Sequence, residues 1–303
     1  MQNLNSNGKS YFKNELLLKA SGYTIAAKNI MDNLLSGLHK SKLSGFNIEF
    51  SEYKQFNTGD DVKYIDWKLY GKTEKLFMKK FEEESVFNAS ILLDISNSMG
   101  FTSNSSVNLS KLEYAKFTAA CLIYKILQQN DYFEFTVFND NSVNLIDTTN
   151  SLSIIKKVDD IFLKIEPSGK TDYLKVFTDY LSKLKKRKLL IIISDLISEN
   201  KNINFQDIIS KIILLRNSGN NVIFIQILDD AEINFNLEGI SEFISMENDS
   251  RLFIDPVKIK EKYVSLMKRF LGNIETELLS NGIKYRLFNT SVDIEKNILK
   301  LFG

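Results

Sequence analysis

The sequence has little cysteine and no long apolar run, and both absences narrow the class of protein. Its single cysteine, Cys121, has no intramolecular partner, whereas a secreted chain of 303 residues more often carries paired cysteines. The longest apolar runs, such as residues 189–194, are far shorter than the roughly 20 residues of a membrane-spanning helix. The polar N-terminus lacks the apolar core and cleavage site of a signal peptide. We therefore expect a cytoplasmic protein without a transmembrane segment.

An excess of one charge is also missing. Lys and Arg number 39, Asp and Glu number 38, and the formal net charge is +1. Such a balance creates no broad field that would attract nucleic acid or an anionic membrane. The basic run KLKKRKLL at 183–190 lies between an expected helix and an expected strand, where a charge run is usually a solvated turn. We expect no nucleic-acid partner.

Two kinds of catalytic group are scarce or absent. The only histidine, His39, lies in a polar segment flanked by lysine, which leaves no convincing general base. Three Gly-Lys pairs are followed by Ser or Thr, at residues 8–10, 71–73 and 169–171, but none has a glycine five residues earlier. A phosphate-binding loop of the type G-x-x-x-x-G-K-[ST] is therefore missing, and the chain itself is not expected to be an ATPase.

From about residue 88 onward the chain repeats a strand-then-helix rhythm, which predicts a mostly parallel sheet covered by helices on both faces. The run from 189 to 193 is apolar at every position, as in a central strand buried on both sides. Expected strands are 89–94, 132–138, 188–194, 222–228 and 283–288. Expected helices are 110–129, with Ser110 as its N-cap, and 151–164, 172–185, 205–217, 257–280 and 292–301. The predicted fold class is a doubly wound, Rossmann-like α/β domain.

Residues 1–85 follow a different pattern. An expected helix at about 13–35 leads into short strand-like pieces separated by the turn signal TGDD at 58–61. No flexible linker separates this part from the rest. We therefore divide the chain into an N-terminal extension, residues 1–85, and an α/β domain, residues 86–303, and expect the extension to pack on that domain.

The stretch SILLDISNSMG at 90–100 places three oxygen-bearing side chains at alternate positions where a strand ends. Asp94 ends the strand, and Ser96 and Ser98 follow in the loop before the next helix. Ligands of an open parallel sheet gather beyond the carboxyl ends of its strands. Hard oxygen donors without sulfur or imidazole favour Mg²⁺ or Mn²⁺ over Zn²⁺. The alternative is that the two serines only cap the loop and helix.

Two further residues are expected at the same edge of the sheet. Thr171 lies in a glycine-containing loop before a helix, and Asp195 ends a second buried strand. Since Mg²⁺ keeps several waters, we expect Ser96 and Ser98, with Thr171 as a third candidate, to bind the ion directly. Asp94 and Asp195 would hold coordinated waters. One coordination place would then stay open for a carboxylate from another molecule.

The pattern resembles the metal-ion-dependent adhesion site of the von Willebrand factor A domain, whose signature is D-x-S-x-S, then Thr, then Asp. The matching residues are Asp94, Ser96, Ser98, Thr171 and Asp195. The resemblance implies a binding role. It also implies that a bound metal, Mg²⁺ with Mn²⁺ or Ca²⁺ as alternatives, would capture a Glu or Asp of a partner protein.

The region ahead of this loop resembles the bacterial family called domain of unknown function 58, on Gly59-Asp60-Asp61 and the following IDW at 65–67. Members of this family are commonly encoded beside MoxR-type AAA+ ATPases. The resemblance therefore implies such an ATPase as partner, in a chaperone-like or complex-assembly role, and no enzymatic activity of the chain itself.

The alternative function is a metal-dependent phosphoryl-transfer hydrolase in which Asp94 is the nucleophile. Haloacid-dehalogenase-like phosphatases have a second Asp two residues after the first, where this sequence has Ser96. Cys121 lies among apolar residues in an expected helix, which indicates a packing role rather than redox or nucleophilic chemistry.

Overall fold

The computed structural model describes residues 22–37, 53–55, 70–71, 77–79, 87–103, 109–184, 187–197, 204–236, 241–244, 251–254 and 256–302. The segment with Gly59-Asp60-Asp61 and the IDW at 65–67 lies outside the described residues, as do His39 and the first part of the helix expected at 13–35. Within the described ranges no helix is both long and apolar enough to cross a membrane.

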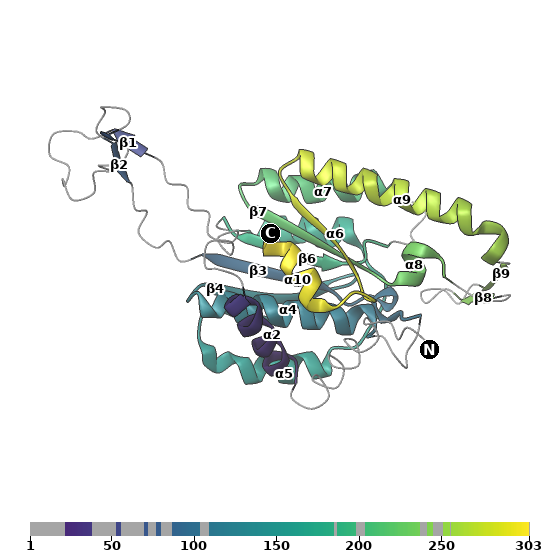
Figure 1. Cartoon of the computed structure of the whole chain (residues 1–303), viewed down its shortest axis with the longest axis horizontal. Helices are drawn as coiled ribbons and strands as arrows, with labels where there is room; N and C mark the ends of the chain where they lie inside the picture. Colours follow the sequence, from purple (N-terminus) through teal and green to yellow (C-terminus); the bar gives the residue numbers. More distant parts are fainter. Residues whose placement is uncertain are drawn as a thin grey trace.

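A six-stranded sheet forms the centre of the molecule, with strand order β10-β7-β6-β3-β4-β5 (Figure 1). Neighbouring strands pair in parallel except β5, which runs antiparallel to β4 at one edge. This arrangement confirms the predicted mostly parallel α/β fold. The strands are β3 (Asn88–Asp94), β4 (Tyr132–Phe138), β5 (Ser142–Thr149), β6 (Leu189–Ser194), β7 (Asn221–Leu228) and β10 (Lys284–Asn289).

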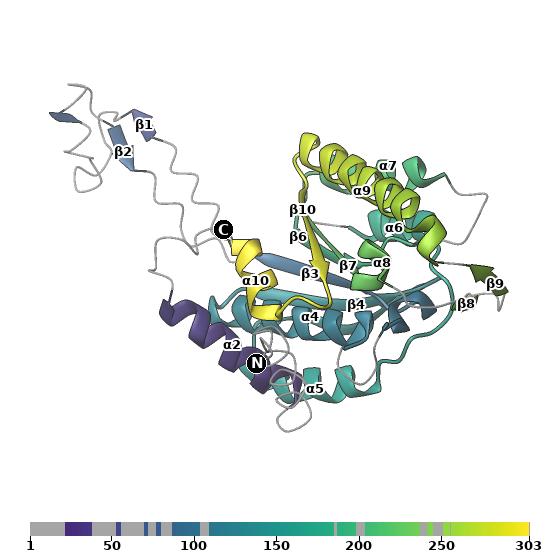
Figure 2. The same ribbon diagram turned by 45° about the vertical axis from the view of Figure 1, so that its right-hand side comes forward.

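Alternate residues of the central strands contribute to two hydrophobic cores, one on each face of the sheet. In β3, Ile91 and Leu93 belong to one core, whereas Leu92 belongs to the other. The first core is completed by α2 (Tyr23–Gly37), α4 (Lys111–Gln128), α5 (Ile155–Lys164) and α10 (Ile294–Phe302). The second is completed by α6 (Tyr173–Lys183), α7 (Phe205–Asn217) and α9 (Pro256–Ser280), which lie together on the opposite face (Figure 2). Because both faces are covered, the strands are apolar at successive positions rather than alternating.

The helix α4 begins and packs as its sequence predicts. The Ser110 side chain accepts a hydrogen bond from the Glu113 N–H, and the Glu113 carboxylate accepts one from the Ser110 N–H. This reciprocal pair is a capping box, which satisfies two backbone donors at the helix start. Cys121 is fully buried on α4, and burial raises the pKa of its thiol, in agreement with a packing role.

The N-terminal helix α2 belongs to the body of the molecule. Its Ala26, Ala27 and Ile30 are buried in the first core, and Tyr23 packs edge-on against Phe162 of α5 with ring centroids 5.6 Å apart. At least this part of the expected extension therefore packs on the α/β domain. The boundary at residue 85 stays a prediction.

Several short elements were not expected from the sequence. The edge strand β5 was missed because Ile146 is the only residue in it that is buried. A lone edge strand with one half-covered face lacks the apolar run of the central strands. The five-residue helix α8 (Asp230–Asn234) was also missed, whereas the helix expected at 151–164 is present and begins as a 3-10 turn (Leu152–Ile154) before α5. Two short antiparallel pairs complete the description, β1 (Tyr53–Gln55) with β2 (Phe77–Lys79) and β8 (Ser241–Ile244) with β9 (Arg251–Ile254).

Candidate metal site

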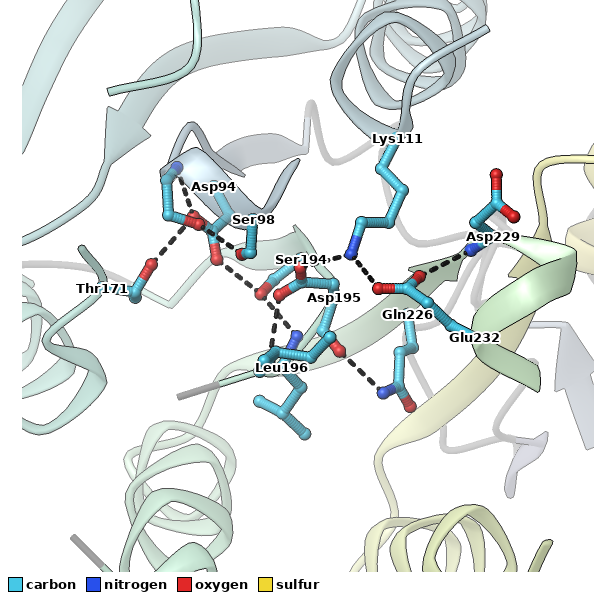
Figure 3. Close-up of polar contacts among 12 residues, drawn as sticks. Asp94, Ser98, Lys111, Thr171, Ser194, Asp195, Leu196, Gln226, Asp229 and Glu232 are labelled. Carbon is cyan, nitrogen blue, oxygen red and sulfur yellow. Dashed lines mark hydrogen bonds and ion pairs between the residues drawn. The ribbon is translucent and has the colours of Figure 1, made fainter. Parts of the chain in front are cut away.

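The candidate site lies where the central strands β3 and β6 end. These strands pair in parallel, with Leu93 opposite Ile193, so Asp94 and Ser194 reach the same edge of the sheet and Asp195 follows directly. The 3-10 turn η2 (Asn97–Gly100) continues from β3, and the loop before α6 reaches the same edge (Figure 3). This is the carboxyl edge of the sheet, where ligands of such folds bind.

Asp94 is fully buried and accepts four hydrogen bonds. One carboxylate oxygen accepts from the Ser96 N–H at 2.9 Å and from the Thr171 hydroxyl at 3.0 Å. The other accepts from the hydroxyls of Ser194, at 2.7 Å, and Tyr173, at 3.0 Å. All four donors are neutral, and no Lys or Arg of the described ranges bonds to this carboxylate. A buried carboxylate without a cationic partner is costly unless a cation supplies the missing charge.

The two serines of the D-x-S-x-S stretch lie side by side. Their hydroxyl oxygens are 3.1 Å apart, Ser96 is fully buried, and Ser98 is half-buried. Ser96 precedes the turn η2, but its side chain makes no capping hydrogen bond there. Its hydroxyl instead faces the hydroxyl of Ser98, which gives two adjacent neutral oxygens beside Asp94.

The loop that carries Thr171 is fixed to the D-x-S-x-S loop through its backbone. The Ser168 N–H donates to the Ile95 carbonyl at 2.7 Å, and the Asn97 N–H donates to the Gly169 carbonyl at 2.9 Å. Two loops that are 73 and 72 residues apart in the chain at these contacts are thus joined to each other. This backbone pairing brings the Thr171 hydroxyl to Asp94.

Gly169 has the left-handed backbone conformation, with φ of +68°. A Cβ atom at this position would lie 3.2 Å from Nδ2 of Asn139, which itself donates to the Ser168 carbonyl. A side chain would therefore be disfavoured both by the backbone conformation and by the close approach of Asn139.

Asp195 lies at the same edge but has a different environment from Asp94. It is fully buried, one oxygen accepts from the Ile197 N–H at 3.0 Å, and the other accepts from Nζ of Lys111 at 2.8 Å. Leu196, which lies between Asp195 and Ile197 in the chain, has a backbone φ of +58°, a strained value for a residue with a bulky side chain. Its N–H donates to the Ser194 hydroxyl, which in turn donates to Asp94.

The electrostatics of the site favour an added positive charge. Burial, and next the negative charge of Asp195, raise the pKa of Asp94 to about 6. Burial and the charges of Asp94 and Asp195 also raise the pKa of Tyr173 well above its ordinary value, so its hydroxyl stays protonated and donates. Asp94 and Asp195 therefore repel each other in a buried setting, and a divalent cation between the loops would relieve this repulsion.

The donor set fits a hard cation. Two carboxylates and three hydroxyls meet at this edge, and none of the donors is sulfur or imidazole. The described residues contain no cluster of three or more His, Cys, Asp or Glu that would hold a metal, so a site here depends on hydroxyl oxygens as well as carboxylates. That combination suits Mg²⁺ or Mn²⁺, which retain water ligands, better than Ca²⁺, which takes six to eight oxygens.

The structure joins four of the predicted residues directly and the fifth indirectly. Asp94 bonds to the Ser96 backbone and to Thr171, Ser98 contacts Ser96, and Asp195 follows the residue that bonds to Asp94. Four other residues of the site were not predicted, and they are Ser194, Tyr173, Lys111 and Glu232. Ser194 could have been predicted, because it follows the apolar run 189–193 at the same sheet edge. Lys111 could not, because a lysine directly after a helix N-cap does not indicate a site.

Comparisons with known proteins found similar solved structures and one matching family. No curated protein sequence matches the chain. BatB of Bacteroides thetaiotaomicron, a conserved hypothetical protein, is 16% identical over 71% of this chain and 98% of its own, with a TM-score of 0.45. An aerotolerance-related membrane protein of Bacteroides fragilis is 19% identical with the same coverage and TM-score. The SpRpn10 VWA domain is 10% identical over 71% of this chain and 95% of its own, with a TM-score of 0.43.

Family membership comes from the sequence match. The family described as "Protein of unknown function DUF58" matches residues 52–269, a span that begins ahead of the D-x-S-x-S loop and extends into α9. Because this span is more than half of the chain, the protein belongs to the DUF58 family.

Proposed function

We propose that the chain is a metal-dependent protein-binding module, in which the site around Asp94 holds Mg²⁺ or Mn²⁺ and captures a Glu or Asp of a partner protein. The observation that carries this proposal is the fully buried Asp94, which has four neutral donors and no cationic partner among the described residues. A cation at this edge would supply the missing charge, and the family resemblance of the five residues points to the same role.

The approach that we propose from solvent to the site passes Ser98 and the loop before Thr171. Ser98 is half-buried, and residues 166–170 of the loop are exposed. An acidic side chain of a partner would approach there and take a coordination place of the ion in exchange for water. Three hydroxyls add no charge to the site, so the ion would keep its attraction for a further carboxylate.

Asp94 is a poor candidate for a phosphoryl-transfer nucleophile. Both of its carboxylate oxygens accept two hydrogen bonds each, and its side chain is fully buried. A nucleophile needs a free lone pair directed at substrate and, in most cases, a neighbouring base. These contacts favour a holding role for Asp94, and we propose a binding protein rather than an enzyme.

The partner we propose is a MoxR-type AAA+ ATPase, and the pair would act in a chaperone-like or complex-assembly role. This part of the proposal rests on the family resemblance alone. A protein without a phosphate-binding loop of its own would then depend on its partner for ATP hydrolysis.

The metal requirement is tested by calorimetry and thermal unfolding of the full chain with MgCl₂ or MnCl₂. An ion that binds only the folded state adds roughly 2.7 kcal/mol of stability at a hundred times its Kd. We expect a higher melting temperature with metal for the wild type and no shift for Asp94→Ala. If neither metal produces heat or a shift with the wild type, the metal requirement is wrong.

The capture mechanism is tested on the complex once a partner is identified by pull-down. Ser98→Ala and Thr171→Ala are expected to weaken the complex with little loss of folding stability, and EDTA is expected to weaken the wild-type complex in the same way. A complex that survives EDTA at full affinity, or that tolerates reversal of every exposed acidic residue of the partner, would contradict capture through a metal.

A further inference from the structure

Lys111 is a fully buried lysine at the edge of the candidate metal site. It is the first residue of α4, and its Nζ donates to Asp195 at 2.8 Å and to Glu232 at 2.6 Å (Figure 3). Its side chain is 0% exposed. One of the two carboxylates that it contacts is thus a predicted metal-site residue, and the other belongs to α8.

Burial by itself would favour the neutral form of a lysine. Here Nζ lies 2.8 Å from a carboxylate oxygen of Asp195 and 2.6 Å from one of Glu232, and two ion pairs at this distance favour the charged form. The side chain is therefore an ammonium ion, fixed within hydrogen-bond distance of a carboxylate that would also serve the metal.

Glu232 holds the ammonium from a second side and is itself fixed. Its other carboxylate oxygen accepts from the Asp229 N–H at 2.8 Å in the capping box of α8, and its backbone carbonyl accepts from the Tyr263 hydroxyl of α9 at 2.8 Å. Lys111 is consequently held between two anchored carboxylates rather than free to swing away from Asp195.

The charges of these groups determine how strongly a cation would be attracted. Counted as ionised groups, Asp94, Asp195 and Glu232 contribute three negative charges and Lys111 contributes one positive charge, so the four side chains together carry −2. One divalent cation would balance this charge. Loss of the ammonium would leave −3, and loss of the Glu232 charge would leave −1.

We propose that Lys111 is an internal counter-ion of the metal site, which shares Asp195 with the bound cation and lowers the affinity for it, while Glu232 on α8 offsets part of this effect. The proposal rests on the proposed metal site and adds two residues that determine its affinity. It also connects cation binding to α8 and α9, because Glu232 contacts both the ammonium and Tyr263.

The test is the Kd for Mg²⁺ and Mn²⁺ of the full chain, measured by calorimetry for Lys111→Met and Glu232→Gln. Because a unit charge removed near a divalent ion changes its binding energy by more than 1 kcal/mol even at intermediate dielectric, each change is expected to be about tenfold or more. The directions are opposite. Lys111→Met is expected to tighten metal binding, and Glu232→Gln is expected to weaken it.

Lys116→Met is the matched control. Lys116 lies on the same helix, is also buried, and donates to the carbonyls of Phe162 and Ile165 rather than to the site. This substitution is expected to change the melting temperature without changing the Kd. A lysine with a purely structural role at 111 would behave like Lys116.

Each outcome decides between the two proposals. If the wild type binds metal but neither Lys111→Met nor Glu232→Gln changes the Kd, the counter-ion role is wrong and the metal site stands. If only Lys111→Met binds metal, Lys111 blocks the site and the proposed metal-dependent function is wrong. If no variant binds, both proposals fail. Should Lys111→Met not fold, Glu232→Gln alone still decides, since unchanged affinity in that variant overturns the role of Lys111.

Discussion

At the scale of single residues, Gly169 has the most specific requirement of the site. Its left-handed backbone and the 3.2 Å approach of Asn139 to a hypothetical Cβ leave no room for a side chain without a shift. Asn139 also holds the loop through the Ser168 carbonyl, so displacing it would loosen the segment that brings Thr171 to Asp94.

Gly169→Ala is therefore expected to lower the free energy of unfolding by about 1–2 kcal/mol, because an L-residue in this conformation is strained. The same substitution is expected to weaken Mg²⁺ binding.

The control is Gly272→Ala in the middle of α9, where nothing lies within 4 Å of a new Cβ. Its free energy of unfolding should rise by about 0.5–1 kcal/mol. Urea unfolding measures the free energy of unfolding of both variants. Equal stability of Gly169→Ala and the wild type would contradict the requirement for glycine at position 169.

At the scale of elements, a polar network joins strands β3 and β4 to α6 and to the residue before β6. Glu134 of β4 lies opposite Ser90 of β3 in the sheet register, accepts from Nζ of Lys188 at 2.7 Å and accepts from the Tyr180 hydroxyl at 3.1 Å. Burial alone would raise the pKa of Glu134, but the hydrogen bonds from Lys188, Ser90 and Tyr180 outweigh it and lower the pKa below its ordinary value.

A depressed carboxylate pKa stabilises the fold above the pKa of the unfolded chain, and this contribution is lost as the pH falls through the folded-state pKa. Glu134→Gln is expected to lower the free energy of unfolding by about 1 kcal/mol at pH 7, and the difference from wild type should shrink below about pH 4. Urea unfolding across this pH range measures it, with the exposed Glu166→Gln as control. A difference that stayed constant or grew on acidification would contradict the assignment.

At the scale of the whole molecule, α2 closes the core over α4 and α5. Its start is fixed by Asp159 of α5, which accepts from the Thr24 N–H at 2.9 Å and also from the Thr24 hydroxyl. Ala27 is 0% exposed, and small residues on this face allow the helices to approach closely. The domain formed around the sheet therefore includes a helix from far ahead of its first strand.

Ala27→Glu is expected to lower the free energy of unfolding by about 3 kcal/mol or more, because it places an unpaired carboxylate in the core. Asn29→Glu, at an exposed position of the same helix, adds the same side chain and is expected to have little effect. Thermal unfolding compares the two. Equal melting temperatures would mean that α2 does not contribute to the core.

The sequence by itself determined the secondary-structure elements that depend on interactions between residues close together in the chain. The all-apolar run 189–193 predicted a central strand, and Ser110 predicted the start of α4, because burial on both faces and N-capping are both visible in adjacent residues. The residues Asp94, Ser96, Ser98 and Thr171 were expected at one edge because the carboxyl ends of parallel strands meet there, and their hydrogen bonds join them at that edge. Their role as metal ligands stays a prediction.

Only the tertiary structure decided which side chains complete the site. Lys111 and Glu232 are 121 residues apart, and Asp195 meets Lys111 across 84 residues of chain. Such contacts form because α4 and α8 both begin at the same edge of the sheet. No pattern of neighbouring residues in the sequence predicts that arrangement. The edge strand β5 was decided in the same way, since its pairing with β4, rather than an apolar run, makes it a strand.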